Sequence, residues 1–61
     1  MCELKVVVNN KQVFENAIYA KVTGNNVIVK DIMGKTMEFK GHTITEVNIT
    51  NEQLTLSPPK S

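Results

Sequence analysis

The 61-residue chain carries seven lysines, six acidic residues and no arginine, and its net charge is +1. The lysines are scattered along the sequence and give no support to a basic patch that binds a nucleic-acid backbone. The single cysteine excludes an intramolecular disulfide. No apolar run approaches the roughly 20 residues of a membrane span, so we expect a cytoplasmic protein without membrane contact and without a nucleic-acid partner.

Apolar and polar residues alternate along most of the chain, which is typical of strands that bury one face. The alternating segments are, in chain order, residues 4–8, 17–22, 27–32, 36–40, 44–50 and 53–56. Turn-forming residues separate them: Asn9-Asn10, Gly24-Asn25-Asn26, Met33-Gly34-Lys35, Gly41-His42 and Asn51-Glu52. Residues 11–16 are ambiguous, and residues 41–44 have room for a single helical turn.

The spacing of about ten residues between strands predicts a small all-β fold. We expect five short strands that close into an SH3-like barrel, because closure removes exposed sheet edges. The barrel is predicted as one domain over residues 1–56. Residues 57–61 contain Pro58 and Pro59, and they are predicted to form a flexible tail.

The usual residues of an enzyme are nearly absent from the sequence. It has no paired carboxylate motif, no glycine-rich phosphate loop and no second cysteine for a zinc site. Cys2 and His42 are the only residues for a cysteine–histidine dyad, and a chain this small leaves little room for a pocket of about 300 Å³ or more. We therefore expect no enzyme activity, and we interpret His42 as an exposed loop residue without a role.

Cys2 has two interpretations. It shares its parity with Leu4, Val6 and Val8, so it is a candidate for a small buried hydrophobic residue. Its position also brings a thiolate, a backbone amide and a terminal amine together, and such donors in one plane suit Ni(II) or Cu(II). One chain leaves the square-planar site incomplete, and a two-fold homodimer with both N-termini near its axis completes it.

The opening MCELKVVV resembles that of CooT-type proteins, small nickel-binding proteins linked to carbon monoxide dehydrogenase maturation. The Gly24 hairpin and the segment GHTITEVNIT at residues 41–50 continue the resemblance in outline. It implies an SH3-like barrel, a homodimer and one Ni(II) bound through Cys2, with Met1 supplying the terminal amine where it is retained. The implied function is storage or delivery of Ni(II) to a metalloenzyme client.

Two alternatives remain open. HypC-type hydrogenase maturation chaperones also begin with Met-Cys, but they carry a proline a few residues later, where this chain has Val6-Val7. A small β-barrel that binds RNA is the second alternative, from a different functional class.

Overall fold

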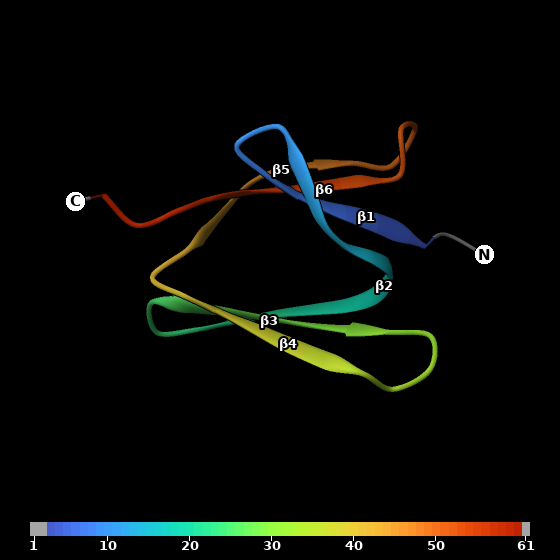
Figure 1. Ribbon diagram of the computed structural model, residues 1–61, viewed down its shortest axis with the longest axis horizontal. Helices are drawn as coiled ribbons and strands as arrows, with labels where there is room; N and C mark the ends of the chain where they lie inside the picture. Colours follow the sequence, from blue (N-terminus) through green and yellow to red (C-terminus); the bar gives the residue numbers. More distant parts are fainter. Residues whose placement is uncertain (1–2, 61) are drawn as a thin grey trace.

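A computed structural model describes residues 3–60, and these residues form six β-strands and no helix (Figure 1). The strands are β1 (Leu4–Val8), β2 (Lys11–Thr23), β3 (Asn26–Asp31), β4 (Thr36–Lys40), β5 (Thr43–Asn48) and β6 (Gln53–Ser57). The predicted all-β class is therefore confirmed. None of the described residues forms a helix long and apolar enough to cross a membrane.

The six strands form one sheet in the order β4-β3-β2-β1-β6-β5. Strands β1 and β6 are parallel, and every other neighbouring pair is antiparallel. The prediction of a closed five-stranded barrel is wrong for the described residues. Each of the six alternating segments forms its own strand, and β4 and β5 remain as the two edges of an open sheet.

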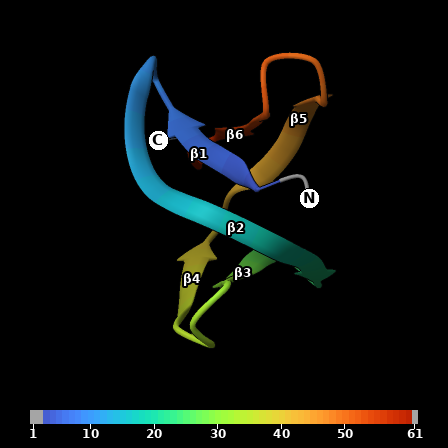
Figure 2. The same ribbon diagram turned by 90° about the vertical axis from the view of Figure 1, so that its right-hand side faces the viewer.

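Strand β2 bends the sheet into two halves, because its first part pairs with β1 and its second part pairs with β3. The register shifts where the two parts meet, around Asn16 and Ile18, and Asn16 has a φ of 59°. At such a shift one strand carries an extra residue relative to its partner, which bends the strand and increases its twist. Figure 2 shows β2 curving away from β1 towards β3. The ambiguous residues 11–16 thus belong to the longest strand.

The turns at Asn9-Asn10, Gly24 and Gly41 form with the backbone that their residues favour. Asn9 and Asn10 both have positive φ, 53° and 64°, as in the two-residue type I′ hairpin. At the β2–β3 hairpin only Gly24 has positive φ, at 58°, which matches a type II′ turn. Gly41, at φ 75°, links β4 to β5, and no helical turn forms over residues 41–44.

The core lies between the two halves of the bent sheet. Its buried side chains are Val6, Phe14, Ala17, Val27, Val29, Phe39, Leu54 and Leu56. Two of the three aromatic residues are thus in the core, but Tyr19 is 47% exposed. After the register shift Tyr19 pairs with Lys30, whereas the buried Val29 pairs with Ala20, so Tyr19 lies on the outer face.

The core face of the sheet is incompletely covered. Val22, Met37 and Val47 lie opposite the buried residues Val27, Val29 and Leu54, respectively, so their side chains share the core face. They are nevertheless 57%, 41% and 55% exposed. An open sheet of this size leaves part of its apolar face in contact with water.

The segment after β6 lies along the sheet. Ser57 is the last residue of β6, and Pro58 is half-buried. A Cβ atom placed on Gly41 would lie 3.0 Å from the Cβ of Pro59, so the ring of Pro59 lies directly against Gly41.

Candidate functional site

The predicted metal ligands Met1 and Cys2 lie outside the described residues. The described chain next to them is the start of β1, which neighbouring strands hold from both sides. Leu4 pairs with Ala17 of β2, and the Lys5 backbone N–H donates to the Glu52 carbonyl oxygen at 2.8 Å. A donor set at the N-terminus would therefore lie shortly before a strand that is paired on both sides.

Three half-exposed isoleucines lie on segments that flank the start of β1: Ile18, Ile32 and Ile49. Ile18 follows Ala17, the β2 partner of Leu4. The Ile32 N–H donates to the Asn16 carbonyl oxygen at 3.2 Å, and the Ile49 carbonyl accepts from the Glu52 N–H at 3.1 Å. The β3–β4 and β5–β6 turns lie at the same end of the molecule as the start of β1 (Figure 1). This end of the sheet is consequently rich in exposed apolar surface.

Asp31, the last residue of β3, has a structural role in the β3–β4 turn. One carboxylate oxygen of Asp31 accepts hydrogen bonds from the backbone N–H groups of Met33 and Lys35, both at 2.9 Å. Residues 3–60 contain no group of three or more histidine, cysteine, aspartate or glutamate side chains arranged to hold a metal ion.

His42 lies in the connection between β4 and β5, as predicted, but its side chain is partly buried rather than fully exposed. Its Nδ1 lies 2.9 Å from the Lys40 carbonyl oxygen, which can only accept, so Nδ1 carries the proton. The ring meets Phe39 edge-on, with 5.5 Å between centroids. These contacts fix the ring and leave Nε2 as its second polar atom.

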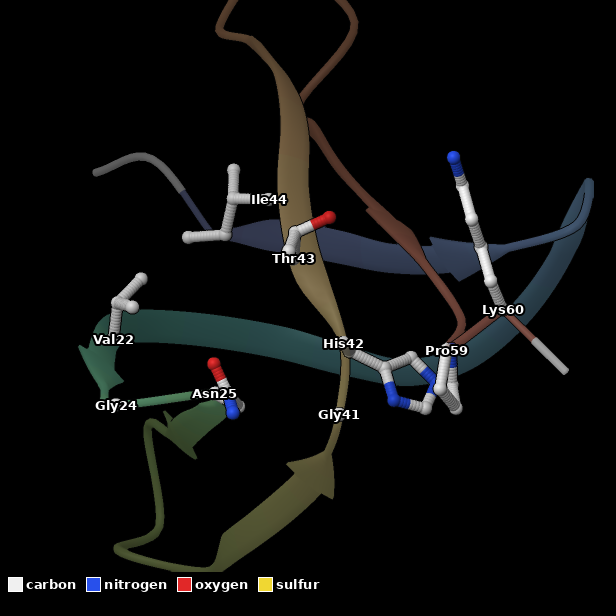
Figure 3. A pocket seen from close by; sticks show the side chains of 9 residues that line it. All are labelled: Val22, Gly24, Asn25, Gly41, His42, Thr43, Ile44, Pro59 and Lys60. Atoms are coloured by element: carbon white, nitrogen blue, oxygen red, sulfur yellow. The ribbon is translucent and has the colours of Figure 1, made fainter.

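His42 is also part of a cleft of about 500 Å³, shown in Figure 3. The lining residues are Val22, Gly24, Asn25, Gly41, His42, Thr43, Ile44, Pro59 and Lys60. The cleft exceeds about 300 Å³, the lower size of small-molecule sites, so the argument that the chain is too small for a pocket is wrong. Its walls come from three segments that are distant in the sequence, and no local motif marks them.

The cleft and the start of β1 lie at opposite ends of the long axis of the molecule (Figure 1). The β2–β3 hairpin and the β4–β5 connection, which both line the cleft, are at one end, and the start of β1 is at the other. The fold thus places His42 far from the described residues closest in sequence to Cys2. It gives no support to a cysteine–histidine dyad.

Comparison with known proteins gives no match among curated proteins. A family model described as CO dehydrogenase accessory protein CooT matches residues 1–57. The match includes Met1, Cys2 and all six strands of the sheet. The resemblance of the opening sequence is therefore confirmed, and the chain belongs to the CooT family of CO dehydrogenase accessory proteins.

Proposed function

We propose that this protein is a homodimeric, cytoplasmic accessory protein, not itself an enzyme, that binds Ni(II) and stores or delivers it for maturation of CO dehydrogenase. The observation that carries the proposal is the family match, which runs from Met1 through Cys2 to residue 57. CO dehydrogenase is a nickel enzyme, so nickel is the cargo that such an accessory protein would handle.

The proposed donors are the Cys2 thiolate, a backbone amide and the terminal amine, which belongs to Met1 where that residue is retained. Nitrogen and sulfur donors in one plane suit the square-planar preference of Ni(II). Because the thiol and the amide must lose protons, binding strengthens as the pH rises. A single terminus leaves at least one position open, and the same terminus of a second copy fills it.

The surface described above supports a second copy. The described residues include eight buried apolar side chains and eight large hydrophobic side chains that stay exposed. A core this small contributes little stability, and oligomerisation is one common remedy. Ile18, Ile32 and Ile49 flank the start of β1, so a contact through them would bring two N-termini near each other.

Nickel titration of the purified protein, followed by absorption spectroscopy and sedimentation, tests the proposal. We expect a thiolate-to-nickel charge-transfer band that saturates at one nickel per two chains. Cys2→Ser should abolish tight binding and leave the circular dichroism spectrum unchanged.

A matched control keeps the thiol and changes only the terminal amine, by placing two extra residues before Met1. This variant should bind nickel more weakly than the wild type and more tightly than Cys2→Ser. Undiminished affinity in Cys2→Ser would reject the site, and a monomer that binds one nickel per chain would reject the shared site.

A further inference from the structure

The outer face of the β2–β3–β4 half carries a group of lysines around one aromatic ring. Val27 and Val29 of β3 are buried, so Ile28 and Lys30 lie on the opposite, outer face. Tyr19 pairs with Lys30, and Lys21 pairs with Ile28. Lys40 of β4 pairs with Asn26, which shares this face. We call Tyr19, Lys21, Ile28, Lys30 and Lys40 the lysine face.

The lysine face has more positive charge than the chain as a whole. It holds three of the seven lysines, and the one acidic side chain among its paired positions is Glu38, which lies opposite Ile28. Glu38 accepts a hydrogen bond from the side-chain amide of Asn26 at 3.1 Å. A protein with a net charge of only +1 thus presents a local positive surface.

Tyr19 and Ile28 give this charged surface an apolar centre. Tyr19 is 47% exposed, and the Lys30 Nζ lies 5.3 Å from the centroid of its ring. Ile28 is half-buried between its neighbours on the sheet. The face can therefore contact an aliphatic or aromatic side chain while its lysines pair with surrounding negative charges.

We propose that the lysine face binds an extended acidic segment of a partner protein. Lys21 and Lys30 are diagonal neighbours on adjacent strands, so their Cα atoms are about 7–8 Å apart. Alternate residues of an extended chain are about 6.6 Å apart, and their side chains point the same way. Two carboxylates at alternate positions of such a segment match the two ammonium groups.

A single-stranded nucleic acid fits this face less well. Sheets that bind RNA usually stack two or three bases on exposed aromatic rings. The lysine face has one such ring, that of Tyr19, and the Lys30 ammonium group already lies over it. Lysine is a compact point charge without the bidentate geometry of arginine. Nickel takes no part in this contact, so the inference stands independently of the proposed function.

The test is a titration of the full chain, labelled with nitrogen-15, with an acetylated peptide of alternating glutamate and serine, followed by the backbone amide resonances. We expect saturable shifts at β2, β3 and β4, with a Kd below about 1 mM. Affinity should fall severalfold as salt rises from about 0.01 M to about 0.15 M, because screening shortens the reach of exposed charges.

Two double variants make the test specific. Lys21→Gln with Lys30→Gln should weaken peptide binding at least tenfold. Lys5→Gln with Lys11→Gln removes the same charge from the other half of the sheet and should change it less than twofold. Both pairs are exposed, so the fold should persist in each variant. Equal effects of the two variants, no saturable binding, or tighter binding of a ten-nucleotide single-stranded RNA would each overturn the inference.

Discussion

The contact between Gly41 and Pro59 can be measured by a double-mutant cycle. Gly41 has a φ of 75°, and a side chain in this left-handed region costs about 1–2 kcal/mol. Alanine recovers about 0.4–1 kcal/mol by restricting the unfolded chain. The backbone effect of Gly41→Ala is thus a loss of about 1 kcal/mol in the free energy of unfolding.

The added methyl group also meets the tail. It would lie 3.0 Å from the Cβ and 3.3 Å from the Cγ of Pro59, closer than the about 3.5–4.0 Å of favourable carbon contacts. Overpacking costs about 1–3 kcal/mol, and at this surface site we take the lower end. Gly41→Ala should therefore cost about 2 kcal/mol in the wild type and about 1 kcal/mol in a Pro59→Gly background.

Urea unfolding followed by circular dichroism measures the four free energies of the cycle. Gly24→Ala is the matched control, since Gly24 also has positive φ, at 58°, but no atom lies within 4 Å of an added Cβ. Its cost should be the same in both backgrounds. If Gly41→Ala also costs the same in both backgrounds, Pro59 does not contact Gly41 in solution, and the reasoning from the 3.0 Å approach is refuted.

Three further predictions concern stability, nickel and RNA. Leu54 is 2% exposed and pairs with Val6 and Val47, so Leu54→Ala should lower the free energy of unfolding by about 3–5 kcal/mol. Val47 is exposed, and Val47→Ala should lower it by under about 1 kcal/mol in the same urea unfolding experiment. Similar costs for the two variants would contradict the assignment of the core. His42→Ala should change nickel affinity by less than tenfold, about 1.4 kcal/mol, in the absorption titration, and a larger loss would make His42 a ligand or a support for one. Because the net charge is only +1 and arginine is absent, fluorescence anisotropy should show no binding of short single-stranded RNA tighter than about 10⁻⁴ M at physiological salt. Micromolar, salt-sensitive binding would favour the RNA alternative.

The local pattern predicts some strands to the residue. The predicted segments 4–8 and 36–40 coincide with β1 and β4. Residues 36–40 alternate regularly between two turns, and the Asn9-Asn10 turn marks the end of residues 4–8. Strand β2 is predicted only in part, since its buried residues Phe14 and Ala17 are three positions apart. A register shift between them breaks the period of two, and only the pairing with β1 and β3 shows that the strand continues.

Long-range contacts explain the other differences. A closed barrel requires the two edge strands, β4 and β5, to pair with each other. The alternation of residues within each strand gives no information about whether they do. The cleft beside His42 likewise depends on three separate segments that the fold brings together. The candidate nickel site depends on no such contact within one chain, because Met1 and Cys2 are adjacent in the sequence and their donors are joined by covalent bonds. It stays a prediction.

The parallel pairing of β1 with β6 also affects how the chain folds during synthesis. Lys5 pairs with Gln53 and Val8 with Leu56, so each of these pairs spans 48 positions of the chain (53 − 5 and 56 − 8). A ribosome that adds about 5–20 residues per second takes about 2–10 s to cover that interval. Until then β1 lacks one of its two neighbours, and β5 has no partner at all in the sheet order. Such distant pairings form slowly, so the protein should complete its fold only after β6 has been synthesised.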